Sequence, residues 1–411
     1  MRHVVPFFCR LFTMVVCIAL ISTAAFAQHY TQTNLASDGY IATPFTDPSL
    51  VNPWGLTRSS SGSPWWVADN NSGVSTVYSF VSGTTIGTTV TPPTVTKALT
   101  VTVPAPPKSP TGTLAAPTGV VQNSSPDFVI TGSGTSAPAA FIFCTEDGTI
   151  SAWSGATGPV LLVTTANAVY KGCTSGDVNG TRFLYVANFR SGNIEVYNTS
   201  FSRVRAPEKD DERGRFSEEK FDDDRIPRGF APFNVQNIGG SLFVTYAKQD
   251  PARHDDVAGA GLGYVDVYST SGTLEARFEH GSWLSAPWGV VWAPRDFGEF
   301  SNRVLVGNFG SGQIAAYNGF TGEFIGLMKT FSDPVAQTGE SVVTIDGLWS
   351  LTFGNSAAGC PAAPPTGSGL PACGKAGPYN SLFFTAGPQE ETHGLFGMLT
   401  AIAAEQDGDE E

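Results

Sequence analysis

Acidic and amide side chains recur at turns of this chain, in places where they could gather around a cation. The oxygen-bearing candidates are Glu146, Asp147, Asn188, Asn308 and Asp346. Calcium accepts roughly six to eight oxygen ligands from flexible loops, so these five residues are candidate calcium ligands. Tight β-turns select the same residue types, because their side chains bond the backbone and tolerate left-handed conformations. The residue types alone leave both interpretations open.

A second group of reactive side chains lies in the segment Ala247–Gly259, which joins a lysine, a histidine and several aspartates. His254 beside Asp255 or Asp256 has the composition of a metal-ligand pair or of a general base with its orienting acid. His393 is a second candidate base. The alternative interpretation of the segment is a solvated loop with turn-forming aspartates.

The elements that must position these residues are six copies of one unit, which recur at about 55 to 60 residues. Each copy has a short apolar strand, an aromatic-rich strand that ends in a polar residue, and a third alternating strand. The copies begin near Asn52, Ala116, Tyr170, Ala231, Ala286 and Ile345. Short alternating strands separated by Gly, Asn and Ser turns predict an all-β, six-bladed β-propeller with four-stranded antiparallel blades. A β-sandwich would not repeat a whole sheet motif, and a β-helix would have a shorter period.

The end of the sixth copy predicts how the ring closes. That copy reaches its third strand at Gly394–Leu399, so its fourth strand must come from elsewhere, and Tyr30–Leu35 is the candidate. Closure by the N-terminal strand would remove exposed sheet edges.

A propeller places the loop before each innermost strand and the loop between its second and third strands on one face. The predicted ligand-binding face therefore contains Trp54, Asp69, Asn70, Lys248, Asp250, Asp255 and Trp288. The tryptophans could stack on a flat ligand there, or they could pack between blades.

The N-terminus predicts export. Residues 1–27 have a polar start, an apolar run from Leu11 to Ile21 and small residues around Ala25 and Ala27, as in a cleaved signal peptide. We expect the propeller over residues 28–400, an acidic disordered tail over 401–411, and no membrane span after cleavage. Release into the periplasm or medium is the expected location.

Four cysteines remain after cleavage, and an even number in an exported chain predicts two disulfides. The proposed pairs are Cys144–Cys173, between neighbouring blades, and Cys360–Cys373, within a Pro/Gly-rich loop. The charge of −13 over the whole chain makes a nucleic-acid partner improbable, since phosphate backbones are repelled. The segment Arg203–Arg228, rich in mixed charges, is interpreted as a solvated loop.

Two strings resemble NHL-type propeller repeats: Ala187–Tyr197 and Gly307–Ile314. The chain also resembles a secreted bacterial family of six-bladed β-propellers of uncharacterised function, through segments such as Leu50–Leu56, Gly229–Asn237 and His393–Gly397. This resemblance implies the fold and export, and it implies no activity.

The expected function is that of a monomeric binding or scaffold module, which recognises a protein, peptide or glycan through the channel-mouth face. The alternative is a calcium-dependent lactone or ester hydrolase that resembles six-bladed lactonases in layout. The chain lacks the G-x-S-x-G, H-E-x-x-H and Walker motifs, so no catalytic signature favours an enzyme.

Overall fold

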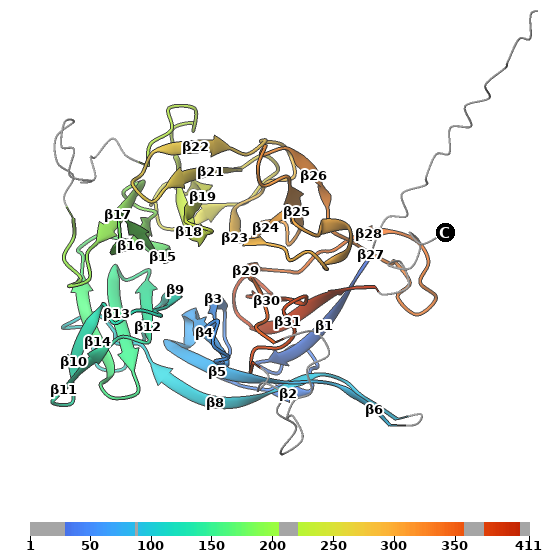
Figure 1. The fold of residues 1–411 in the computed structure, drawn as a ribbon, viewed down its shortest axis with the longest axis horizontal. Coiled ribbons are helices and arrows are strands. Elements are labelled where there is room, and N and C mark those ends of the chain that lie inside the picture. Colours follow the sequence, from blue (N-terminus) through green and yellow to red (C-terminus); the bar gives the residue numbers. More distant parts are fainter. Residues whose placement is uncertain (1–28, 87–88, 205–220, 357–373, 403–411) are drawn as a thin grey trace, which may run out of the picture.

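A computed structural model describes residues 29–86, 89–204, 221–356 and 374–402, which form six antiparallel sheets arranged as blades around a central axis (Figure 1). The predicted all-β, six-bladed propeller is confirmed. Within these residues the only helical segments are two short 3-10 turns, Asn70–Ser72 and Gly298–Phe300. None of the helices in this part of the chain is long and apolar enough to cross a membrane.

Blades 1 to 3 follow the chain, and each runs from an innermost to an outer strand. Blade 1 contains β3 (Pro53–Thr57), β4 (Trp65–Asp69), β5 (Val74–Val81) and β8 (Thr94–Thr102). Blade 2 contains β9 (Pro117–Gln122), β12 (Phe141–Thr145), β13 (Thr149–Ser154) and β14 (Gly158–Thr164). Blade 3 contains β15 (Tyr170–Val178), β16 (Thr181–Asn188) and β17 (Asn193–Tyr197), with one further bridge between Tyr197 and Arg203.

Blades 4 to 6 complete the ring. Blade 4 contains β18 (Phe230–Ile238), β19 (Ser241–Gln249), β21 (Gly263–Ser269) and β22 (Leu274–Arg277), and the short β20 (Asp256–Val257) pairs with β19. Blade 5 contains β23 (Pro287–Trp292), β24 (Val304–Asn308), β25 (Ile314–Tyr317) and β26 (Phe324–Leu327). Blade 6 contains β29 (Leu348–Phe353), β30 (Leu382–Ala386) and β31 (Leu395–Ala401).

The N-terminal strand β1 (Tyr30–Ser37) is the fourth strand of blade 6. It pairs antiparallel with β31, from Tyr30 opposite Ala401 to Ser37 opposite Leu395. The hydroxyl of Tyr30 also donates a hydrogen bond of 2.9 Å to the carbonyl of Phe297 next to blade 5. The two ends of the described chain therefore share one sheet. The short β2 (Phe45–Thr46) extends this sheet at its outer edge.

Smaller hairpins lie outside the six blades. They are β6 (Thr84–Ile86) with β7 (Thr89–Thr91), β10 (Val129–Gly132) with β11 (Thr135–Pro138), and β27 (Lys329–Thr330) with β28 (Ser341–Val342).

Each interface between neighbouring blades has its own apolar cluster, and a seventh cluster lies on the axis. Between blades 1 and 2, for example, the ring of Trp66 stacks on Phe141 with centroids 3.9 Å apart. The axial cluster includes Trp54, Phe233 and Trp349. Strand alternation explains this arrangement, because the side chains of each blade leave the two faces of its sheet and meet those of the blades on either side.

Every innermost strand has a register irregularity at one repeated position. The residues at this position, called the axial residues below, are Trp54, Thr118, Lys171, Phe233, Trp288 and Trp349. A β-bulge re-aims a side chain, and here four of the six residues join the axial cluster. Five of them are apolar or uncharged, and Lys171 of blade 3 is the exception.

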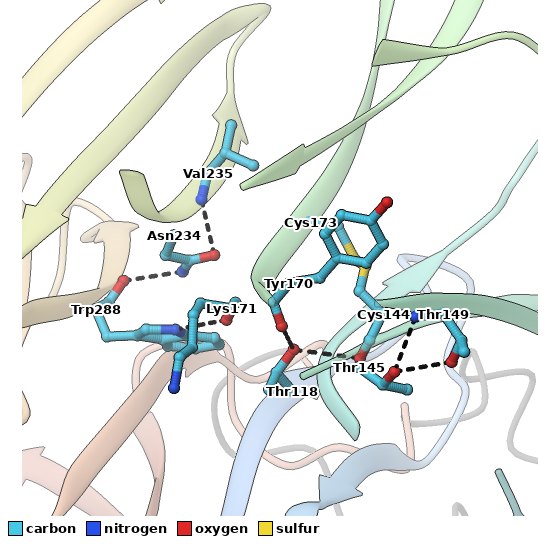
Figure 2. The surroundings of a disulfide bond; sticks show 10 residues. All are labelled: Thr118, Cys144, Thr145, Thr149, Tyr170, Lys171, Cys173, Asn234, Val235 and Trp288. Carbon is cyan, nitrogen blue, oxygen red and sulfur yellow. Dashed lines mark hydrogen bonds between the residues drawn. A yellow bond between two sulfur atoms is a disulfide. The ribbon is translucent and has the colours of Figure 1, made fainter. Parts of the chain in front are cut away.

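A disulfide joins blades 2 and 3. Cys144 lies at the end of β12 and Cys173 lies on β15, beside the axial residues Thr118 and Lys171 (Figure 2). The predicted Cys144–Cys173 pair is confirmed. The predicted Cys360–Cys373 pair, the signal peptide and most of the acidic tail lie outside the described residues.

The prediction for the charged segment Arg203–Arg228 needs a correction at its C-terminal end. Asp223 is buried at 7% exposure and accepts a hydrogen bond of 2.7 Å from the guanidinium of Arg277 on β22. Phe221 packs against the blade 3 and blade 4 tyrosines Tyr185 and Tyr268. Residues 221–228 are therefore anchored to blade 4.

Candidate functional site

Lys171 is the centre of the polar groups at the channel mouth. Its side chain is 2% exposed, and its ammonium contacts a carboxylate oxygen of Glu146 and lies 3.3 Å from Oδ1 of Asp255. The ammonium also lies 5.0 Å from the ring centroid of Trp54 and 5.8 Å from that of Phe189. Burial lowers the pKa of Lys171, but Glu146 and Asp255 raise it further than burial lowers it. The lysine is therefore a buried, protonated cation.

Glu146 reaches the ammonium from blade 2. It follows β12 at the turn into β13, and its side chain is only 12% exposed. One carboxylate oxygen faces Lys171, and the other accepts a hydrogen bond of 2.9 Å from the amide of Asn70 in blade 1. Three blades therefore meet at this carboxylate.

The long loop of blade 4 brings Asp255 to the same place. Oδ1 of Asp250 accepts hydrogen bonds from the backbone N–H of His254 at 2.7 Å and of Asp255 at 3.3 Å, which fixes the tip of the loop. Nδ1 of His254 lies 2.8 Å from Oδ1 of Asp255. Burial raises the pKa of Asp255, while Lys171 and His254 lower it further, so that the net shift is downward.

Two more carboxyl groups, those of Asp256 and Glu391, interact electrostatically with the ammonium. Burial raises the pKa of Asp256 to about 7, and the charge of Glu391 adds to the shift, while Lys171 opposes it. Burial also raises the pKa of Glu391, whose carboxylate accepts a hydrogen bond of 2.6 Å from the amide of Asn52. We call Glu146, Lys171, Asp255, Asp256 and Glu391 the channel-mouth cluster.

Aromatic rings form the floor beneath this cluster. Trp54 stacks on Trp349 with centroids 3.5 Å apart, and the partly buried Phe309 stacks on the same Trp349 at 3.9 Å. Nε1 of Trp349 donates a hydrogen bond of 3.0 Å to Asn52, the residue that also holds Glu391. Nε1 of Trp288 donates to the carbonyl of Lys171 at 2.9 Å (Figure 2). The floor and the charged cluster are thus linked by direct contacts.

Beneath the axial residues, on the other side of them from the cluster, the channel contains a pocket. Its lining includes Gly55, Gly119, Asn234, Gly289 and Ser350, the residues that directly follow axial residues in five of the blades.

Three of the predicted face residues are buried inside the fold. Trp54 is 1% exposed and Trp288 is 3% exposed, and other rings cover both of them. Of the two interpretations of these tryptophans, stacking on a ligand and packing inside the fold, their burial favours packing, since the axial bulge turns them into the channel. Asp69 is 0% exposed, and one of its oxygens accepts a hydrogen bond of 2.9 Å from the N–H of Thr76 on β5.

The other predicted face residues lie at or beside the mouth. Asn70, Asp250 and Asp255 belong to the contacts described above. Lys248 lies on β19, and its ammonium is 5.3 Å from the ring of Phe230 in the same blade.

Of the five predicted calcium ligands, Glu146 is the one that belongs to the channel-mouth cluster. The other four make hydrogen bonds to separate partners: Asp147 accepts from the N–H of Ala116, Asn188 donates to Glu195, Asn308 accepts from the N–H of Ser285, and Asp346 accepts from the N–H of Gln389. These hydrogen bonds give each of the four side chains a structural role, and the prediction that they bind calcium stays a prediction.

Both candidate bases lie in histidine–aspartate pairs. Nδ1 of His254 contacts Asp255, and Nδ1 of His393 lies 2.7 Å from Oδ2 of Asp38. The ring of His393 also stacks on Tyr40 with centroids 4.0 Å apart. A carboxylate at Nδ1 leaves Nε2 as the nitrogen that could exchange a proton.

Sequence reasoning missed Lys171 and Glu391 as site residues. The signal for Lys171 was present in the aligned repeats, because it stands where the other copies have Trp54, Thr118, Phe233, Trp288 and Trp349. Glu391 follows Glu390 in a polar turn, and nothing in that pattern tells which of the two carboxylates turns inward.

No protein-family model matches the chain. Relatives by sequence are uncharacterised proteins of Acanthamoeba polyphaga mimivirus. One is 28% identical over 86% of this chain and 76% of its own length, and another is 27% identical over 89% and 84%. These relatives are viral, whereas the resemblance had indicated a bacterial family.

Solved structures share the fold at low identity. Virginiamycin B lyase from Staphylococcus aureus is 11% identical, with a TM-score of 0.43 over 91% of this chain and 100% of that chain. A gluconolactonase from Xanthomonas campestris is 14% identical, with a TM-score of 0.32 over 64% of this chain and 82% of that chain. The six-bladed fold is established by the chain's own sheets, and the sequence relatives named above are uncharacterised proteins.

Proposed function

We propose that the chain is an exported, monomeric binding module whose channel mouth takes a positively charged group of a protein, peptide or glycan. The observation that carries the proposal is the channel-mouth cluster. Here Glu146 and Asp255 form ion pairs with the single ammonium of Lys171, and Asp256 and Glu391 interact with it electrostatically. Lys171 neutralises only part of this charge, so the mouth attracts a further cation. The side chain of Asp255 is 67% exposed, which leaves it within reach of a ligand.

Proton release should accompany the binding of a cation. Asp256 and Glu391 have raised pKa values, so both hold protons more readily than ordinary carboxyl groups do. A bound cation favours their ionised forms and lowers both pKa values. Affinity for a cationic ligand should therefore rise with pH through neutrality.

Matched probes test the proposal by isothermal calorimetry. One pair is a lysine-containing peptide and the same peptide with acetyl-lysine; the other is a glucosamine oligomer and the N-acetylglucosamine oligomer of equal length. In each pair only the ammonium group differs. We expect the cationic member of at least one pair to bind, and its acetylated counterpart to bind far more weakly.

Two variants test whether the cationic probe binds at the channel mouth. Glu391→Gln should weaken binding of the cationic probe by about tenfold, as for the loss of one well-placed charge contact. Glu323→Gln is the control, because Glu323 is an exposed acid in the turn after β25, outside the channel-mouth cluster. Absence of binding by both cationic probes, or an equal effect of the two variants, would count against the proposal.

Export is tested on the expressed full-length chain. The apolar run and the small residues before Gln28 support cleavage after Ala27. N-terminal sequencing of the protein recovered outside the cytoplasm should begin at Gln28, and an intact Met1 would contradict the signal peptide.

A second candidate function, calcium-dependent hydrolysis, has one observation in its favour. Glu146, His254 and Asp255 each offer a ligand atom, and these atoms lie within 4.8 Å of one another. A metal that displaced the Lys171 ammonium there could polarise a carbonyl group, with His393 as the candidate base. Lactone and ester turnover that disappears with a chelator and returns with calcium would favour this function over binding alone.

A further inference from the structure

The mouth of the channel contains three side chains with the composition of a metal site, and a lysine ammonium lies among them. Glu146, His254 and Asp255 bring two carboxylates and one imidazole within 4.8 Å of one another. Lys171 forms ion pairs with two of these three residues. We propose that the ammonium of Lys171 is the resident cation of this site and holds the carboxylates that would otherwise bind a divalent metal ion.

The surroundings of Lys171 suit an ammonium better than a metal ion. Its side chain is 2% exposed and lies over the rings of Trp54 and Phe189, which attract an organic cation through their π faces. Aromatic rings offer no lone pair to a metal ion. Nε1 of Trp288 fixes the backbone carbonyl of Lys171, so the strand that carries the ammonium is itself held in place.

The repeat explains how a lysine comes to occupy this place. At the axial position the other five blades carry Trp, Thr, Phe, Trp and Trp, and the side chains at this position turn toward the channel. A lysine at the same bulge in blade 3 has a stem long enough to bring its charge to Glu146 of blade 2 and Asp255 of blade 4. Lys171 thereby does what a shared metal ion does, since one cation holds ligands from separate elements together.

Removal of this ammonium should convert the site into one that binds a divalent metal. Lys171→Met keeps an unbranched, apolar stem over Trp54 and leaves Glu146 and Asp255 without their cation. One imidazole and two carboxylates are ligands that manganese and zinc accept, so Mn²⁺ is a suitable probe of the emptied site. The wild-type protein should bind a divalent metal ion only weakly at this site, because the ammonium of Lys171 and the metal ion would repel each other there.

The experiment compares wild type and Lys171→Met after chelation, with Mn²⁺ as the probe. Electron paramagnetic resonance follows free Mn²⁺, and thermal unfolding follows stability. Lys171→Met should bind one Mn²⁺ at least about tenfold more tightly than wild type and gain melting temperature on its addition. The double variant Glu146→Gln/Lys171→Met is the matched control, and it should lose this gain because a ligand is missing.

Two results would overturn the inference. One is equally tight Mn²⁺ binding by wild type and Lys171→Met, which would mean that the ammonium does not exclude the metal. The other is a Lys171→Met protein that gains nothing from Mn²⁺. If Lys171→Met does not fold alone, refolding with Mn²⁺ becomes the measurement: recovery of native circular dichroism supports the inference, and failure to recover it contradicts the inference. Neither outcome depends on whether wild-type protein binds a cationic ligand.

Discussion

The ammonium of Lys171 lies 5.0 Å from the ring centroid of Trp54, so the charged mouth of the propeller contacts its aromatic axis directly. Trp54 in turn stacks on Trp349 at 3.5 Å, and Trp349 donates a hydrogen bond to Asn52, which holds Glu391 of the same mouth. The floor of the site and its rim are therefore one connected structure. A substitution of an axial ring should therefore lower the free energy of unfolding and also shift the charged groups at the mouth.

Trp54→Leu tests this connection. Trp54 is 1% exposed, and its replacement removes a stacked ring and leaves a cavity beneath Lys171. We expect a loss of about 3 kcal/mol in the free energy of unfolding, near the range for large-to-small changes of buried aromatic residues. Denaturant unfolding followed by circular dichroism measures it. Trp292→Leu is the control, because Trp292 is only partly buried and contacts the exposed Phe320, and a comparable loss there would contradict the axial role.

The disulfide should stabilise the pairing of blades 2 and 3. Cys144 and Cys173 are 29 residues apart, so the bond shortens a loop in the unfolded chain. The double variant Cys144→Ser/Cys173→Ser should lose about 2–4 kcal/mol of unfolding free energy, as cross-links of this kind do. Guanidinium unfolding of oxidised wild type and variant gives the difference. Equal midpoints for the two proteins would show that the cross-link adds no stability.

The fold could be predicted from the sequence because each blade repeats the same local pattern. Ala187–Tyr197 and Gly307–Ile314 share strand, turn and strand signals, and both strings occupy the same place in blades 3 and 5. Six copies of such a unit fit a ring of sheets and few other architectures. The Cys144–Cys173 pair could be predicted for the same reason, because the register of the repeats brings blades 2 and 3 side by side.

The site was harder to predict from the sequence than the fold, because tight turns and metal-ligand shells select the same residue types. Asn188 and Asn308 matched the expected ligands by type, yet the side chain of each hydrogen-bonds within its own blade, to Glu195 and to the N–H of Ser285 respectively. Trp54 matched a stacking surface, but a bulge turned it inward. The aligned repeats mark Lys171 as the charged exception at the axial position. The acids around it come from loops of other blades, and sequence periodicity carries no information on the geometry of those loops.

The glycines that follow axial residues should tolerate no side chain. A Cβ on Gly289 of β23 would lie 2.6 Å from the carbonyl oxygen of Trp349 and 3.0 Å from the amide nitrogen of Leu351, both on the neighbouring innermost strand. Gly289→Ala should push blades 5 and 6 apart and cost about 1–3 kcal/mol, as overpacked sites do. Gly155→Ala is the control, since the atom nearest to its new Cβ would be 3.9 Å away. Thermal unfolding should give a lower melting temperature for Gly289→Ala than for Gly155→Ala. Equal melting temperatures would refute the close contact between the innermost strands of blades 5 and 6.

Folding stability should fall as the pH rises toward neutrality, and Asp266 should cause part of that fall. Asp266 is 2% exposed on β21, and burial, helped by the nearby Asp223, raises its pKa to about 7. The folded state therefore keeps a proton that the unfolded chain releases near pH 4. Between these two values each pH unit should cost up to about 1.4 kcal/mol for this group, and the dependence should end above pH 7.

Asp266→Asn isolates the contribution of this carboxyl group. The amide cannot ionise, and it can still donate a hydrogen bond to Asp223, whose pKa is held low by hydrogen bonds from Arg277. Other buried acids, Asp256 among them, titrate in the same window, so the informative quantity is the difference between the two proteins. Unfolding free energies at pH 5 and pH 8 should differ less in Asp266→Asn than in wild type. Parallel pH profiles would mean that Asp266 is already ionised at pH 5, in which case the buried pair with Asp223 carries two negative charges beside Arg277.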